Sequence, residues 1–348
     1  MSADRPVERG RLVAERVFYP MPLRSRVEEE LIARAWKFFR RDPAELLGYD
    51  DAQAVAFGGL LVAKVDVFDE TTDWLPGMSM ADAGWKAAVA ALSDVLVKGA
   101  KPLGVLLGLG LPEDSCDAAD ELFQGVEEAC RRMGAHVWGG DTNLSDHLYL
   151  SVTAVGVAER LVPRGGAQPG DVLMVAGFGI LSPVAYAVLL ENAPLCPGAE
   201  AAIRRAYRPE PVDAGFWLNV SRYATASIDD SDGFALSLHY LAEASGVRLE
   251  LDNLPMSQQL VECAEAWGRD PVELALYRGG EEYSFIFTVP PDKVEHVLAE
   301  AEKRGVKVHV IGRVARGTGV HLKGYGEVQR KGWSFGSWRD STRSSRPS

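Results

Sequence analysis

Apolar segments with the periods of strands and helices alternate through the first part of the chain, and they strongly limit the folds open to it. LLVAKVDVF alternates like a strand and AALSDVLVKGA has the spacing of a helix. The pattern predicts, in order, strand 60–68, helix 81–98, strand 103–109, helix 117–133, strand 136–138 and strand 148–158. This order predicts an α+β layer with helices on one face of a sheet.

A second α+β unit is predicted after a segment rich in Gly and Pro, RLVPRGGAQPGD at 160–171, which indicates a connection between domains. Its predicted elements are strand 172–176, a helical region to Tyr223, strand 226–228, helix 234–245, strand 247–251, strand 284–289, helix 292–304 and strand 307–313. We expect four regions: an N-terminal helical extension (1–47), an N-terminal domain (48–159), a C-terminal domain (160–338) and a disordered tail (339–348).

Charge and composition exclude several classes of protein. With 47% hydrophobic and 25% charged residues the chain is an ordinary globular protein. Its formal net charge of -12 argues against nucleic acid and against an anionic membrane surface as partners. The charged start of the sequence lacks the apolar core of a signal peptide.

The four cysteines are far apart and form no CxxC pair. We therefore expect neither a zinc site nor a disulfide framework, and the default location is a reducing cytoplasm.

Aspartates stand at positions that a fold alone does not require. Asp66 lies inside an apolar, β-branched strand, where a carboxylate is costly unless it is paired or bound to metal. Others are at the ends or within apolar elements: Asp50, Asp51, Asp94, Asp141, Asp229, Asp230 and Asp232. Oxygen ligands on several such elements suit a hard cation such as Mg²⁺, which usually completes its shell with nucleotide phosphates and water.

Each aspartate also has an ordinary interpretation. Asp94 could pair with Lys98 on a solvated helix face. Asp141 and Asp232, beside glycines, could be turn residues, and Asp50 with Asp51 could be a solvated loop pair. The chain contains neither a GxxxxGK[ST] loop nor the HRD and DFG motifs, so a nucleotide would have to bind in another way.

An ordered series of motifs resembles the thiamine-monophosphate kinase family, within the superfamily of aminoimidazole-ribotide synthetase, over roughly residues 45–320. The motifs are GYDDA (48–52), VDVFDETTDWLP (65–76), GWKAAVAALSDVLVKGAKP (84–102), GGDTN (139–143), RGGAQPGD (164–171), SIDDSDG (227–233) and RGGEEY (278–283). The resemblance implies a two-domain α+β fold and a homodimer. In that dimer the N-terminal domains bind metal and ATP and form a shared β-barrel, while the C-terminal domain is α/β.

The resemblance also implies an Mg²⁺- and ATP-dependent kinase with a small-molecule acceptor, and it assigns residues to each role. The Mg²⁺ ligands would be Asp51, Asp66, Asp94, Asp141, Asp229 and Asp232, of which Asp94, Asp141 and Asp232 would be catalytic. Gly140, Asp141, Arg164 and Ser231 would contact the nucleotide. Asp73, Glu281 and Arg330 would face the acceptor.

Two acceptor positions depart from the family pattern: the family has histidine at the position of Asp73 and an aromatic residue near Arg330. The acceptor is therefore either thiamine monophosphate or another small hydroxyl, amine or amide compound. Thiamine monophosphate would need no general base, because its phosphate is largely dianionic at pH 7. A non-catalytic nucleotide-binding protein is the alternative from another class.

Overall fold

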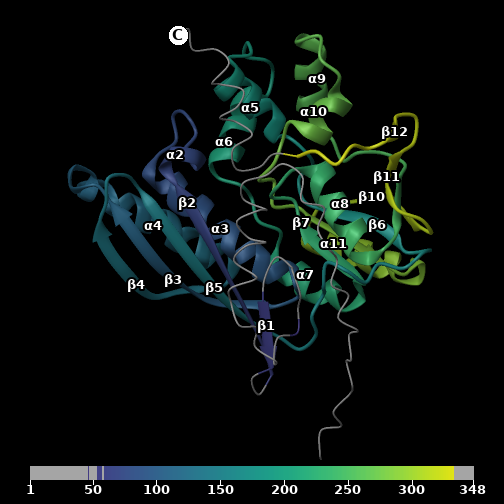
Figure 1. Ribbon diagram of the computed structural model, residues 1–348, viewed down its shortest axis with the longest axis horizontal. Coiled ribbons are helices and arrows are strands. Elements are labelled where there is room, and N and C mark those ends of the chain that lie inside the picture. The colour runs from purple at the N-terminus through teal and green to yellow at the C-terminus, as the bar shows by residue number, and fades with distance from the viewer. Residues whose placement is uncertain (1–45, 47–52, 57–58, 333–348) are drawn as a thin grey trace, which may run out of the picture.

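The structure is a computed structural model, and it describes residues 46, 53–56 and 59–332. The expected N-terminal extension, Asp50, Asp51 and the expected tail lie outside the described residues. The chain forms two α+β halves that lie side by side (Figure 1).

The first half is a five-stranded sheet with helices on one face. Its elements are β1 (Gln53–Ala56), β2 (Leu60–Asp69), α2 (Glu70–Asp73), α3 (Met80–Val97), β3 (Lys101–Leu111), the 3₁₀ helix η1 (Glu113–Ala118), α4 (Ala119–Met133), β4 (His136–Leu144) and β5 (Tyr149–Ala158). The strand order is β1-β2-β5-β3-β4, and all pairs are antiparallel except β3 with β4.

Helix α3 is the central element of the molecule. Ser79 and Asp82 form a capping box at its N-terminus, which satisfies two backbone N–H groups that the helix leaves unpaired. Most of its residues are buried, as expected for a helix that is apolar nearly all round. It packs on β2 and β5 in the first half and on β7 (Ala226–Asp229) in the second.

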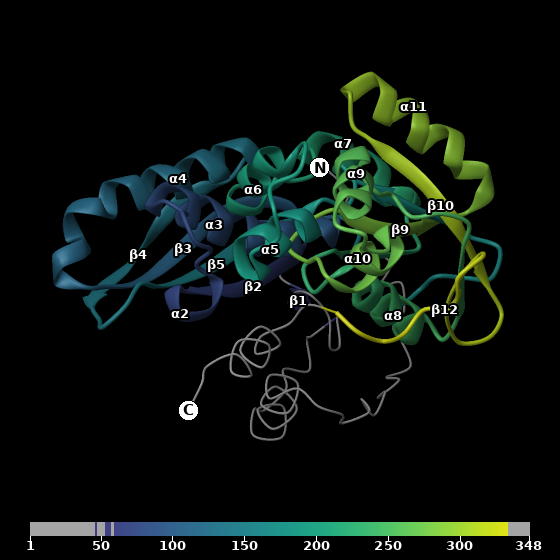
Figure 2. The same ribbon diagram turned by 90° about the horizontal axis from the view of Figure 1, so that it is seen from above.

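Two glycines allow α3 and α4 to pack closely. A Cβ atom on Gly84 would lie 2.1 Å from the carbonyl oxygen of Leu122, and one on Gly125 would lie 1.9 Å from that of Ala81. Only glycine fits at such a backbone contact. The two helices cover one face of the sheet (Figure 2), and the opposite face is exposed at several large apolar side chains.

The second half is built on a seven-stranded sheet of order β12-β11-β8-β10-β6-β9-β7. Besides β7 its strands are β6 (Val172–Ala176), β8 (Arg248–Leu251), β9 (Phe285–Val289), β10 (Val308–Ala315), β11 (Gly319–Leu322) and β12 (Gly326–Glu327). Its helices are α5 (Ser182–Glu191), α6 (Ala199–Tyr207), α7 (Ala214–Val220), η2 (Ser221–Tyr223), α8 (Phe234–Ser245), α9 (Gln258–Ala266), α10 (Pro271–Tyr277), η3 (Pro291–Lys293) and α11 (Val294–Arg304).

Strand β6 and helix α8 have the bounds that the sequence predicts. The prediction for 136–138 was too short, because β4 continues to Leu144, and Asp141 therefore lies within a strand and is not a turn residue. Helices α9 and α10 and the last two strands were not predicted. They are short, and short elements carry too few periods to be recognised.

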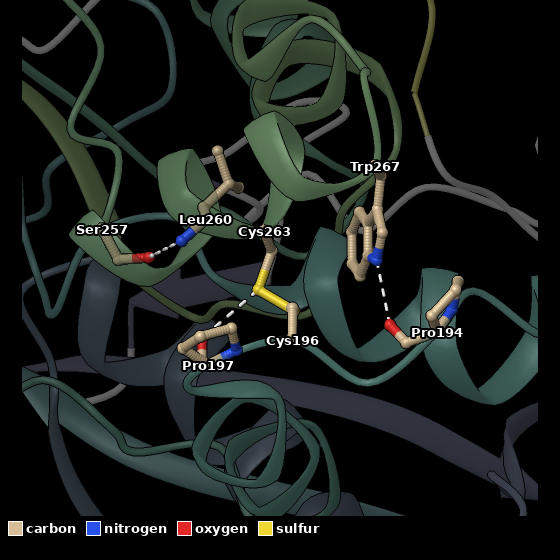
Figure 3. The surroundings of a disulfide bond; sticks show 7 residues. All are labelled: Pro194, Cys196, Pro197, Ser257, Leu260, Cys263 and Trp267. Atoms are coloured by element: carbon tan, nitrogen blue, oxygen red, sulfur yellow. Dashed lines mark hydrogen bonds between the residues drawn. A yellow bond between two sulfur atoms is a disulfide. The ribbon is translucent and has the colours of Figure 1, made fainter.

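The expectation that the cysteines are unpaired was wrong. Cys196, in the loop between α5 and α6, forms a disulfide with Cys263 of α9, and their Cα atoms are 5.4 Å apart (Figure 3). The two residues are 67 positions apart, so their proximity depends on how α5, α6 and α9 pack and leaves no spacing motif in the sequence. The cysteine-based argument for a cytoplasmic location is thereby lost.

Among the described residues, no helix is both long and apolar enough to cross a membrane.

Candidate active site

Two of the predicted metal ligands share one ammonium group. Asp66 of β2 and Asp94 of α3 lie 3.7 Å and 2.5 Å, respectively, from the Nζ atom of Lys64. Asp94 is only 5% exposed, and a carboxylate buried to that degree needs a cation nearby. The strand and the helix therefore present two carboxylates to one position that already holds positive charge.

The interpretation of Asp94 as part of a solvated helix face was wrong. Lys98 is fully buried, and its Nζ atom donates to the backbone oxygen of Ser227 at 2.8 Å. This bond connects α3 to β7 of the other half. Asp94 and Lys98 thus both point into the protein, and Asp94 is held by Lys64.

A third predicted ligand, Asp229, reaches the same region from the second half. It is 1% exposed at the end of β7, and its Oδ2 atom accepts a hydrogen bond of 3.1 Å from Ser93 Oγ of α3. Because Ser93 immediately precedes Asp94, this bond brings the two carboxylate-bearing elements together. Ser231 donates to Asp229 Oδ1 at 3.4 Å, and Asp232 follows it in the same turn.

The carboxyl group of Asp230 lies beneath that turn. Burial raises its pKa well above the ordinary value, and the negative charges of Glu282, Asp229 and Asp232 act in the same direction. Asp230 therefore gives up its proton less readily than an ordinary aspartate. While protonated, it adds no negative charge to Asp229 and Asp232.

Two of the residues predicted to face the acceptor meet in a small pocket of about 40 Å³. It is lined by Thr72, Asp73, Trp74, Leu75, Lys86, Leu190 and Glu281. Burial raises the pKa of Asp73 to about 6, although the backbone N–H of Asp69 donates to its Oδ2 atom at 2.8 Å. The negative charge of Glu281 adds to this rise.

The loop that carries Glu281 has an unusual backbone. Both Glu281 and Tyr283 have positive φ angles, of 56° and 49°, which are rare for residues other than glycine and are often found at functional sites. Glu282, between them, accepts backbone hydrogen bonds of 2.6 Å from Leu181 and Ser182 at the start of α5. These bonds fasten the loop to that helix.

Tyr283 connects the metal and acceptor residues. Burial is the main reason that the pKa of Tyr283 lies well above its ordinary value. The negative charges of Glu281, Asp66, Asp229 and Asp73 raise this pKa further. The negative charges of both predicted sites therefore act on one neutral hydroxyl. The motif RGGEEY contains Tyr283, but the sequence offers no separate sign of its role.

The predicted nucleotide residues Gly140 and Asp141 lie apart from this group. They are on the edge strand β4, at a hollow of about 370 Å³ lined largely by apolar side chains of β3, β4 and α4. In the sheet β4 is three strands from β2, which corresponds to about 14 Å. Within one subunit the structure thus does not bring Asp141 to Asp66.

Arg164 and Arg330 lie together in the second half, although the resemblance gives them different roles. Their guanidinium carbons are 5.2 Å and 5.3 Å from the centre of the Tyr240 ring on α8. Arg330 also pairs with Glu243 through its Nε atom at 3.0 Å. A Cβ atom on nearby Gly332 would lie 2.5 Å from the backbone oxygen of Asp232, so this segment runs next to the Asp232 turn.

In the part of the chain that the structure describes, no three His, Cys, Asp or Glu side chains are grouped closely enough to hold one metal ion. The predicted set of Mg²⁺ ligands therefore remains a prediction, and Asp51 lies outside the described residues. The sequence analysis missed the cations Lys64 and Lys86. Their signal was a lysine within an otherwise apolar strand or helix.

Both halves match known families. Residues 49–158 match the AIR synthase related protein, N-terminal domain, and residues 168–324 match the AIR synthase related protein, C-terminal domain. The chain is 34% identical over 294 residues to thiamine-monophosphate kinase of Aquifex aeolicus, covering 83% of this chain and 92% of the relative. The corresponding enzyme of Nitrosopumilus maritimus is 31% identical, covering 78% and 88%.

Solved structures agree with these relatives. AaThiL complexed with AMPPCP and TMP superposes with a TM-score of 0.76 at 31% identity, covering 89% of this chain and 99% of the other. The protein tt0281 from Thermus thermophilus has a TM-score of 0.77 at 34% identity, covering 87% and 98%. The hydrogenase maturation protein in the HypE-HypF complex, at 20% identity and a TM-score of 0.68, shares the fold.

Proposed function

The chain belongs to the thiamine-monophosphate kinase family, and from this premise we propose that it transfers the γ-phosphoryl group of ATP to thiamine monophosphate. The observation that carries the proposal is that Lys64 joins Asp66 to Asp94 while Ser93, next to Asp94, bonds Asp229 of the other half. The charges of Asp66, Asp229 and the pocket residues Asp73 and Glu281 all act on the Tyr283 hydroxyl. Donor and acceptor of a phosphoryl group must lie this close to react in line.

The side chains in this region fit Mg²⁺. Every donor is a carboxylate oxygen, which hard cations prefer, and Lys64 already places positive charge between Asp66 and Asp94. Asp66, Asp94, Asp229 and Asp232, with Asp51, would hold the ions, and Asp94 and Asp232 would be the catalytic ligands. Bound Mg²⁺ would neutralise the phosphates and the charge that develops between them.

The acceptor phosphate needs no base from the protein, because its second pKa near 6 leaves it largely dianionic at pH 7. Asp73 also favours a second candidate. A carboxyl group with a pKa of about 6 could accept a proton from a hydroxyl or amine compound, so such compounds belong in the assay.

We infer a homodimer from the face of the first sheet that no helix covers. Val65, Val67, Leu106, Trp138, Tyr149 and Val157 are exposed large apolar residues on its strands. An apolar face this extensive beside an edge strand is typical of an interface. Two such sheets, facing each other, would close the barrel that one open sheet cannot form.

The dimer would also give Asp141 a role. Because it lies three strands from Asp66 in its own subunit, we assign Gly140 and Asp141 to the nucleotide and metal of the partner's site. Arg164 and Ser231, both in the second half, would contact the nucleotide. Arg330, which lies at the same Tyr240 ring as Arg164, would lie on the same side of the site.

The test is ADP release with Mg²⁺, ATP and thiamine monophosphate, followed by a panel of hydroxyl, amine and amide acceptors. The wild type should release ADP with thiamine monophosphate, and Asp94→Asn should lower turnover roughly 100-fold or more, because it removes a carboxylate that would hold Mg²⁺ at the transferred group. Asp292→Asn, on an exposed part of the second half, is the matched control and should keep full activity.

Two outcomes would contradict the proposal. Turnover with another acceptor but not with thiamine monophosphate would assign a different substrate to the same chemistry. ATP binding without ADP release with any acceptor would indicate the non-catalytic nucleotide-binding protein.

A further inference from the structure

Lys86 is a buried cation at the base of the acceptor pocket. It lies on α3 and is 2% exposed, and its Nζ atom is 2.8 Å from Glu281 Oε2 and 3.4 Å from the backbone oxygen of Asp73. An ammonium group is rarely buried unless an opposite charge accompanies it. The lysine and Glu281 therefore depend on each other.

Glu281 receives two hydrogen bonds on the same oxygen. Besides Lys86, the hydroxyl of Tyr186 on α5 donates to Oε2 at 2.6 Å. In the part of the chain that the structure describes, Oε1 has no hydrogen-bond partner, and Glu281 lines the pocket. The two donors thus fully engage one oxygen of the carboxylate and leave the other oxygen for an acceptor that enters the pocket.

The backbone of Glu281 is held in an unusual conformation as well. Glu281 has a φ of 56°, a conformation that costs an ordinary residue free energy and persists only where the surroundings require it. The surroundings here are α3 through Lys86 and α5 through Tyr186.

We propose that Lys86 is a positioning residue for the acceptor: it holds Glu281 through Oε2 and leaves Oε1 for a hydrogen-bond donor of the acceptor, such as an amino group. The inference rests on the proposed function, and it deepens that function by naming the group the pocket recognises. Removal of the ammonium leaves the Glu281 carboxylate without the cation that now holds it, and with Asp73 in the same pocket. A carboxylate that loses its paired cation is held less firmly in one orientation.

The kinetic test compares Lys86→Met with the wild type and Lys86→Arg. Lys86→Met should raise the KM for thiamine monophosphate about tenfold or more, as expected for a lost charged hydrogen bond, and leave the KM for ATP unchanged. Lys86→Arg, which keeps the charge, should restore part of the affinity.

A double-mutant cycle shows whether the lysine acts through Glu281. Lys86→Met combined with Glu281→Gln should be no worse than Glu281→Gln alone, because the partner of Lys86 is already neutral. Fully additive effects, an unchanged acceptor KM, or equal increases in both KM values would overturn the proposal. If Lys86→Met does not fold, Tyr186→Phe removes the other donor and should raise the acceptor KM alone.

A readout without turnover separates this inference from the proposed function. Lys86→Met should lower the melting temperature, because it leaves the Glu281 carboxylate without its paired cation, and the added Glu281→Gln should restore part of that loss. If the wild type does not use thiamine monophosphate, this thermal unfolding series still decides whether Lys86 and Glu281 act as one pair. Fully additive losses of melting temperature in the double variant would overturn the inference.

Discussion

Asp73 illustrates how burial changes the chemistry of one residue. Its side chain lies in the acceptor pocket beside Glu281, and burial is the main reason that its pKa rises from 3.8 to about 6. Between these pH values the folded protein holds a proton that the unfolded chain has released. The free energy of unfolding therefore falls as the pH rises through this interval, and the acceptor pocket is a source of instability at neutral pH.

Replacement of Asp73 by Asn should remove this pH-dependent cost. The stability of Asp73→Asn relative to the wild type should increase by roughly 1 kcal/mol between pH 5 and pH 8, because only the wild type must ionise a buried carboxyl group. Chemical denaturation of both proteins at the two pH values measures the difference. A difference that stays constant with pH would mean that Asp73 ionises normally in the folded state.

At the scale of elements, α5, α9 and α10 form one wall beside the loop that carries Glu281. Glu191 at the end of α5 pairs with Arg269 and with Arg278, which directly precedes the loop. The disulfide joins the segment after α5 to α9, and Trp267 donates to the backbone oxygen of Pro194 next to it (Figure 3). The position of Tyr186, and through it of Glu281, depends on these connections.

Loss of the disulfide should weaken this wall. Cys263→Ser should lower the free energy of unfolding by about 2–4 kcal/mol, the usual effect of opening a long cross-linked loop. Dithiothreitol should lower the melting temperature of the wild type and of Cys130→Ala, whose thiol is free and buried, but not that of Cys263→Ser. Identical melting curves with and without reductant in the wild type would show that the bond is absent in solution.

At the scale of the whole molecule, α3 connects the halves and the first sheet leaves one face open. Two hydrogen bonds join the halves at the end of α3. Lys98 Nζ donates to the backbone oxygen of Ser227, and Ser227 Oγ donates to the backbone oxygen of Val97. The halves are thus fixed to each other through buried polar groups. Several large apolar side chains remain exposed on the open face of the first sheet.

A charge on that face should separate the subunits. Leu106→Glu, at the middle of the face, should convert the dimer to a monomer in sedimentation analysis, because an unpaired carboxylate is costly in an apolar interface. It should also abolish turnover if Asp141 serves the partner's site. Leu298→Glu on α11, a substitution of similar exposure in the other half, is the control and should leave the assembly intact. A wild type that sediments as a monomer would exclude the dimer.

The sequence by itself determined the features that depend on local pattern. The strand patterns of 60–68 and 172–176 predicted β2 and β6, and the helical spacing of 81–98 and 234–245 predicted α3 and α8. A carboxylate inside an apolar strand predicted Asp66 to be paired or bound to metal, and the structure shows its pairing with Lys64. These predictions needed only the periods of strands and helices and the cost of burying charge.

Only the tertiary structure decided which side chains meet. It paired Cys196 with Cys263, placed Lys64 between Asp66 and Asp94, and set Lys86 beneath Glu281. It also placed Asp141 within an edge strand, away from Asp66. Such partners are far apart in the chain, and their meeting depends on how whole layers pack, which no local period records. The same packing buries these charged side chains, and a buried charge needs a partner of opposite charge.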